Sequence, residues 1–139
     1  MRSLPPTNAE IDELTQFIPR LYRKNFRPIK EWKGVDRAEE SITFPWPEYE
    51  KDVVEFMEVA SKDCWLDYQY VPEEASKMLG DVESIKDASL EDIKAMLTFC
   101  IRRERFVDGH FASMIEEGKM KAILDRLVVL RNKNVQPRR

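Results

Sequence analysis

The sequence predicts one compact all-α domain over residues 1–139, with five or six helices and a long irregular connection near residues 25–47. The length of 139 residues suits one domain of ordinary size. The composition, 42% hydrophobic and 10% aromatic, is globular. Every strong hydrophobic repeat has the 3.6-residue period of a helix, and none has the two-residue period of a half-buried strand.

The first helix is predicted to begin near residue 8. Thr7 and Glu10 stand at the spacing of a capping box, in which each side chain bonds the other's backbone. An apolar stripe follows, made of Ile11, Leu14, Ile18 and Leu21. Pro19 removes a backbone donor, so the helix is expected to kink or end near Ile18. From residue 25 to 47 the helical period is lost, which predicts the irregular connection.

The middle of the chain predicts two further helices. Pro47 suits the first position of an amphipathic helix. Its apolar stripe consists of Tyr49, Val53, Phe56, Met57 and Ala60. The aromatic stretch from Cys64 to Val71 could form a brief extended segment. Pro72 then opens a short helix that Gly80 closes.

Three helices are predicted in the C-terminal part. Ser89 and Asp92 form a cap for a helix that reaches about Arg105. Asp108 is expected to cap a short helix that Gly118 closes. The last helix continues to about residue 132, with a stripe of Met120, Ile123, Leu124, Leu127 and Val128.

Several classes of protein are disfavoured by composition. Cys64 and Cys100 are far apart and the chain has one histidine, so we expect no metal site and no cofactor, and two reduced thiols. The N-terminus has no apolar leader, and no uncharged stretch approaches the length of a membrane span. The expectation is a soluble, cytoplasmic protein with no membrane partner.

The charges are unevenly distributed along the chain. Residues 1–37 carry a net charge of +3, residues 38–95 carry −11, and residues 96–139 carry +5. One interpretation is nucleic-acid binding through the basic ends, with Arg23, Arg27, Lys121 and Arg126 as the candidate contacts. The alternative is that the basic ends fold back onto the acidic middle.

A second candidate site is the polar cluster at residues 102–110. Arg102 and Arg105 fall on one face of the predicted helix, where guanidinium groups match phosphate or carboxylate. With Asp108 and His110 they could form an anion site, a ligand site or an enzyme site. The alternative is a helix C-terminus whose cations complement the helix dipole. No nucleophile elbow and no glycine-rich phosphate loop accompanies the cluster.

The C-terminal half resembles an uncharacterised prokaryotic family of small helical proteins, a domain of unknown function. The resemblance is strongest over residues 97–127, on Leu97, Thr98, Arg102, Arg105, Phe106, Gly109, Gly118, Arg126 and Leu127. A looser similarity covers residues 17–19, residues 44–49, and Trp65 with Tyr68. It implies a small helical protein and supplies no catalytic residue.

The leading hypothesis is a non-enzymatic helical module that acts through protein contacts, with a protein partner or self-association. It rests on the lack of a catalytic constellation and on six Met and three Trp, residue types enriched at contact surfaces. Nucleic-acid binding and an anion, ligand or enzyme site at Arg102 and Arg105 are the alternatives.

Overall fold

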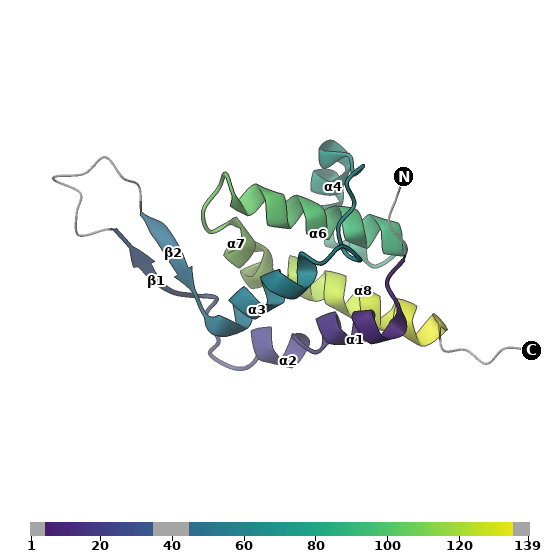
Figure 1. The fold of residues 1–139 in the computed structure, drawn as a ribbon, viewed down its shortest axis with the longest axis horizontal. Coiled ribbons are helices and arrows are strands. Elements are labelled where there is room, and N and C mark those ends of the chain that lie inside the picture. The colour runs from purple at the N-terminus through teal and green to yellow at the C-terminus, as the bar shows by residue number, and fades with distance from the viewer. Residues whose placement is uncertain (1–4, 35–44, 135–139) are drawn as a thin grey trace, which may run out of the picture.

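The computed structural model describes residues 5–34 and 45–134, which form a mostly helical domain with one small hairpin (Figure 1). The elements in chain order are α1 (Asn8–Thr15), α2 (Ile18–Leu21), β1 (Ile29–Lys33), β2 (Trp46–Tyr49), α3 (Lys51–Ala60), α4 (Pro72–Leu79), α5 (Val82–Ile85), α6 (Leu90–Glu104), α7 (His110–Glu116) and α8 (Lys119–Asn134). The hairpin projects from one end of the helical body.

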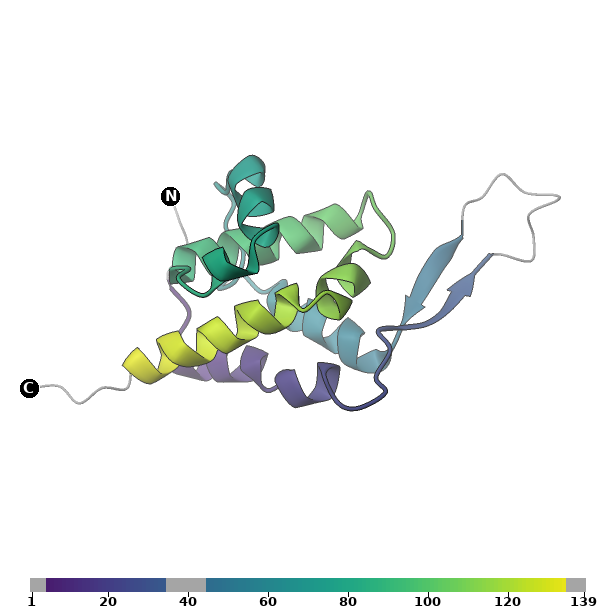
Figure 2. The ribbon, with the colours of Figure 1, turned by 180° about the vertical axis from the view of Figure 1, so that it is seen from behind.

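Helices α6 and α8 are the longest elements and organise the core. Helix α8 packs against α1 and α6, while α4 and α7 pack on α6 (Figure 2). Most residues of the predicted stripes face this core, and the following are buried: Ile11, Leu14, Val53, Phe56, Ala60, Ile93, Leu97, Cys100, Met120, Ile123, Leu124 and Leu127. The prediction is wrong for Val128, which is 38% exposed because it lies at the edge of its stripe, about 100° around α8 from Leu127. Burying such apolar surface is the main force that stabilises a domain of this size. Among the described residues, no helix has the length and apolar character that crossing a membrane requires.

The predicted caps are confirmed at two helices. In α1 the Thr7 side chain accepts the Glu10 N–H, and the Glu10 carboxylate accepts the Thr7 N–H. The same reciprocal pair forms between Ser89 and Asp92 at the start of α6. Each box satisfies backbone donors that a helix start otherwise leaves unpaired. Pro19 lies in the first turn of α2, so α1 ends before this proline and a new helix begins.

The irregular connection expected near residues 25–47 is wrong in part, because it contains β1 and the start of β2. The strands pair antiparallel, with Trp32 opposite Pro47 and Lys33 opposite Trp46, and the register shifts between Ile29 and Glu31. Residues 35–44 of the expected connection lie outside the described residues. Strands this short, one of them with a shift in register, leave no clear two-residue pattern in the sequence.

The predicted start of the second helix is also wrong. Pro47 lies in β2, and α3 begins at Lys51. Proline is tolerated here because each strand of a two-stranded sheet has a free edge. The extended segment expected at residues 64–71 is absent too, since the described chain forms turns there. Helix α5 was missed because it is only four residues long; the Asp81 side chain caps it.

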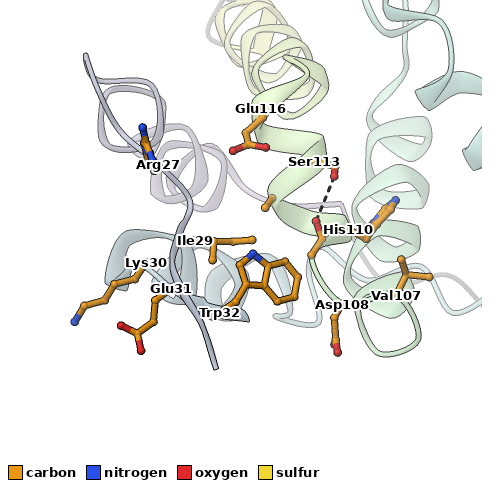
Figure 3. A pocket seen from close by; sticks show the side chains of 12 residues that line it. Arg27, Ile29, Lys30, Glu31, Trp32, Val107, Asp108, His110, Ser113 and Glu116 are labelled. Carbon is orange, nitrogen blue, oxygen red and sulfur yellow. Dashed lines mark hydrogen bonds between the residues drawn. The ribbon is translucent and has the colours of Figure 1, made fainter. Parts of the chain in front are cut away.

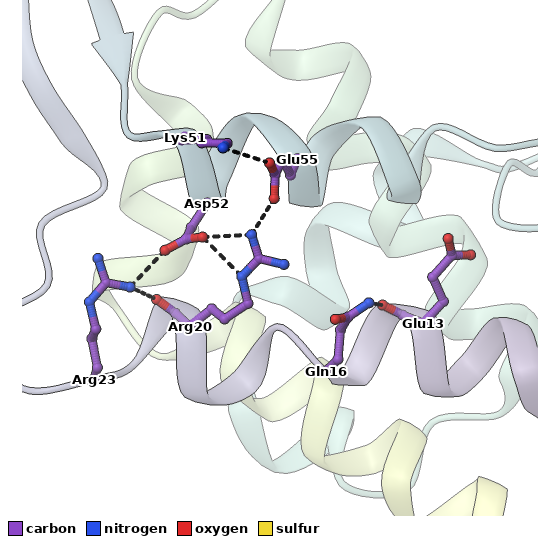
Figure 4. Close-up of polar contacts among 7 residues, drawn as sticks. All are labelled: Glu13, Gln16, Arg20, Arg23, Lys51, Asp52 and Glu55. Carbon is purple, nitrogen blue, oxygen red and sulfur yellow. Dashed lines mark hydrogen bonds and ion pairs between the residues drawn. The ribbon is translucent and has the colours of Figure 1, made fainter.

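The basic N-terminal segment folds onto the acidic middle of the chain (Figure 4). On α2, Arg20 donates to Asp52 at 2.6 Å and also pairs with Glu55. Arg23 donates to the other Asp52 oxygen at 2.7 Å, and this hydrogen bond, with that from Arg20, lowers the pKa of Asp52. These ion pairs account for part of the charge asymmetry without a polyanionic partner.

Candidate functional site

A groove of about 610 Å³ lies between β1 and α7 with the turn before it (Figure 3). Its apolar surface comes from Ile29 and Trp32 on one side and Ala112 on the other. Trp32 is 45% exposed, a large fraction for an indole. Exposed aromatic side chains of this kind are the usual anchors of binding surfaces.

The turn before α7 brings the groove walls together. Gly109 has a φ of +88°, in the left-handed region that favours glycine. A Cβ at this position would lie 3.2 Å from Cη2 of Trp32, so a side chain here would press on the indole. The predicted cap by Asp108 is wrong: Gly109 precedes α7 with no side-chain cap, and Asp108 is exposed.

Glu104 satisfies the start of α7 instead of Asp108. Its Oε1 accepts the Phe111 N–H at 2.7 Å, and its Oε2 accepts the Gly109 N–H at 3.0 Å. Oε2 also accepts the Tyr49 hydroxyl at 2.8 Å. Burial, followed by this hydrogen bond, raises the pKa of Tyr49. One carboxylate at the end of α6 therefore ties the hairpin to α7, next to the positive end of the α7 dipole.

The rim of the groove carries charges of both signs. Arg27, Lys30 and Glu31 lie on the β1 side, and Asp108 and Glu116 lie on the α7 side. No hydrogen bond or ion pair joins the Asp108 or Glu116 side chain to any other residue of the described ranges 5–34 and 45–134. Both carboxylates are therefore available to a cation on a ligand.

His110 and Asp108 do not form an acid–base pair. Figure 3 shows the two side chains pointing in different directions, with His110 turned away from Asp108. Burial, and then the charge of Arg103, lowers the pKa of His110, so the imidazole is neutral at pH 7. Its Nδ1 is buried without a hydrogen-bond partner in the described part of the chain. Asp108 therefore does not orient the His110 imidazole.

Comparison with known proteins bears on almost the whole chain. A model of a family of unknown function, DUF6508, matches residues 6–133. The chain belongs to this family. The resemblance to a family of unknown function is thereby confirmed, and it extends well beyond residues 97–127. No curated protein and no solved structure matches the chain.

In this DUF6508 domain the four residues of the predicted polar cluster are divided between surfaces. Asp108 and His110 line the groove. Arg102 lies instead over the rings of Tyr68 and Tyr70, at 5.9 and 5.3 Å from their centroids, while Arg105 is exposed. Neither arginine lines the groove.

Of the four nucleic-acid candidates, Lys121 and Arg126 line one cleft together, whereas Arg23 and Arg27 lie elsewhere. Arg23 pairs with Asp52, and Lys121 pairs with Asp125 one helical turn away at 2.8 Å. Arg126 donates to the backbone oxygen of Ala88 at 2.8 Å. Arg27 lines the groove.

Sequence reasoning missed Trp32 and Glu104 as site residues. Trp32 had a visible signal, an aromatic side chain among five basic residues at positions 22–33. Glu104 had none, because a glutamate inside an arginine run is typical of a solvated helix surface. Within the described ranges, no group of three metal-ligating side chains comes together.

Proposed function

We propose that this protein is a non-enzymatic module that binds a partner protein by taking an extended segment of it into the groove between β1 and α7. One observation carries the proposal. Four consecutive residues, 29–32, line the groove, whereas none of the β2 residues does. The register shift between Ile29 and Glu31 interrupts the strict alternation of side chains in β1, so Ile29 and Trp32 both point toward α7 (Figure 3). The groove therefore runs beside β1, which pairs only with β2 in the described sheet and so has one free edge.

A free strand edge offers backbone donors and acceptors to an added strand. Pairing along such an edge supplies affinity, and pockets beside it supply specificity for side chains. The exposed indole of Trp32 next to the edge provides such a pocket. The groove therefore supports recognition of an extended peptide better than that of a rigid globular surface.

The dimensions and charges define the peptide. From Gly109 to Glu116 the α7 wall rises by roughly 10 Å, which about three extended residues span. The centre of the groove favours an apolar or aromatic side chain against Trp32. Asp108 and Glu116 stand near the two ends and favour basic side chains on either side of it.

The test uses a phage library of random peptides of about 12 residues, selected on the full chain. We expect an enriched pattern of one apolar residue flanked by basic residues. A synthetic peptide with this pattern is then titrated by fluorescence anisotropy against Trp32→Ala and Trp46→Ala. Trp46 is the matched control, since it is 44% exposed on the same hairpin but does not line the groove.

We expect Trp32→Ala to weaken binding roughly tenfold or more, as at an aromatic anchor, and Trp46→Ala to change it less than about twofold. Selection without a shared pattern, or equal losses for both variants, would refute the proposal. Static light scattering tests whether a second copy of the chain, and not a partner protein, occupies the groove. A dimer at tens of micromolar that Trp32→Ala dissociates would mean that a second copy fills the groove.

The nucleic-acid alternative has less support. Three of its four candidate residues are already engaged with Asp52, Asp125 or the Ala88 backbone. Binding through them would first have to replace these contacts. The enzyme alternative has no aligned acid–base pair at Asp108 and His110 to support it.

A further inference from the structure

A second cleft, of about 680 Å³, lies on the other side of His110, where α4, the second half of α6 and the start of α8 meet. Small-molecule sites in proteins have volumes of this order. The cleft and the groove share only His110 among their lining residues. The cleft is therefore a separate site, and a ligand could occupy it whether or not a peptide binds the groove.

Three cationic side chains from three helices converge on this cleft. Lys77 comes from α4, Arg103 from α6 and Lys119 from α8. No ion pair joins Lys77 or Arg103 to a residue of the described ranges, and Lys119 pairs with Glu117 at 3.4 Å. Glu73 is the one acidic side chain among the described residues that line the cleft.

Several other cations of the described chain pair with carboxylates, whereas Lys77 and Arg103 form no ion pair within the described ranges. Arg20, Lys33, Lys62 and Arg131, for example, all form ion pairs between segments. The Lys119 side chain is 22% exposed, whereas Lys77 and Arg103 are exposed. Like charges that line one cleft repel one another, and an anion bound between them removes this cost.

One side of the cleft wall is apolar and aromatic. Phe99 lies one helical turn before Arg103, whose guanidinium is 6.0 Å from the ring centroid. The His110 ring packs edge-on against Phe99, with centroids 5.9 Å apart. Leu79 and Met114 complete this side. The cleft thus combines a cationic end with a surface for a flat or apolar group.

We propose that this cleft binds a phosphorylated small molecule, with the phosphate held by Arg103, Lys119 and Lys77. A phosphate monoester carries close to two negative charges near neutral pH and three acceptor oxygens, which match three cationic donors better than one carboxylate does. The organic part of the molecule packs on Phe99. Arg103 replaces Arg102 and Arg105 as the arginine that would contact an anion.

The test titrates the full chain with phenyl phosphate, inorganic phosphate, benzoate and phenol by isothermal calorimetry, with amide NMR shifts to locate binding. We expect phenyl phosphate to bind below about 1 mM, inorganic phosphate roughly tenfold more weakly, and phenol and benzoate not measurably. The amide shifts are expected at residues 77, 99, 103 and 119.

Variants separate a built site from general charge attraction. Arg103→Gln and Lys119→Gln are each expected to weaken phenyl phosphate binding roughly tenfold, the usual loss for a charged hydrogen bond. Arg105→Gln is the matched control, because Arg105 is exposed near the end of the same helix and does not line the cleft.

Three results would overturn the proposal. The first is no binding of phenyl phosphate at a concentration about ten times the expected dissociation constant. The others are a loss of affinity in Arg105→Gln equal to that in Arg103→Gln, or benzoate binding as tightly as phenyl phosphate. Arg103 is exposed, so its variant is expected to fold even if Lys119→Gln does not. Circular dichroism melts confirm folding before each titration.

Discussion

Replacing Glu104 with glutamine tests how the groove is held together. The Glu104 carboxylate accepts three hydrogen bonds, from the Tyr49 hydroxyl and from the N–H groups of Gly109 and Phe111. Glutamine has nearly the same shape but only one acceptor oxygen. Its NH₂ group would face at least one of the three donors, so that donor loses its partner.

The magnitude depends on the number and kind of these bonds. Hydrogen bonds to a charged group contribute about 1.5–3 kcal/mol each when buried, and less at a half-buried site such as this one. We expect Glu104→Gln to lower the free energy of unfolding by about 2 kcal/mol and Glu104→Ala by about 3 kcal/mol. Tyr49→Phe removes one bond of the three and is expected to cost about 1 kcal/mol.

Urea denaturation followed by circular dichroism measures these differences, and the double variant Glu104→Gln/Tyr49→Phe completes a cycle. Because the two groups bond each other, the double variant should cost less than the sum of the single ones. A loss below about 0.5 kcal/mol for Glu104→Gln, the range of an ordinary surface substitution, would refute this account of the site. Strict additivity would refute the direct contact between Tyr49 and Glu104.

Single contacts at three other positions also give measurable predictions. Arg23, and then Arg20, lower the pKa of Asp52. Their ion pairs therefore stabilise the folded state above the unfolded pKa of about 4, and this stabilisation is lost as the pH falls. Asp52→Asn should lower the free energy of unfolding by about 1 kcal/mol in urea melts at pH 7 and leave it unchanged near pH 2. Gly109→Ala should lower stability by about 1–2 kcal/mol in thermal melts, because φ is +88° and the new Cβ meets Trp32. Burial, and then the charge of Glu10, raises the pKa of Cys64 to about 11, so Ellman's reagent should react slowly at pH 7 and faster at pH 9.

Each of these has an outcome that contradicts it. An equal cost of Asp52→Asn at both pH values would mean that its ion pairs do not stabilise the fold. A neutral Gly109→Ala would mean that the turn before α7 relaxes without strain. Rapid reaction of Cys64 at pH 7 would contradict the raised pKa of its thiol. Buried Cys100, whose pKa burial raises to about 12, is the slower internal reference.

The helices were predictable because their signals are local. The two capping boxes and the period of the apolar residues lie within single segments, and each corresponds to one face of one helix. A residue's place in such a stripe decides whether it faces the core, whatever the neighbouring helices are. Glycine at residue 118, with a φ of +82°, separates α7 from α8 for an equally local reason.

The hairpin was not predictable on these grounds. Its strands are short, their register shifts between Ile29 and Glu31, and Pro47 suits a helix start as well as a free strand edge. What places Pro47 in a strand is pairing with Trp32, a contact between residues distant in the chain. For Pro47, a position at a helix start and a position at a strand edge are distinguished only by tertiary contacts.

The amino-acid sequence alone therefore determined the helical class, the buried stripes and the family of unknown function. The tertiary structure decided which polar side chains meet. It turned Glu104 to the start of α7, set Arg103 apart from Arg102 and Arg105, and joined Lys77, Arg103 and Lys119 at one cleft. The physical reason is that helical period fixes which face of a helix is apolar, whereas contacts between polar groups depend on how separate helices pack.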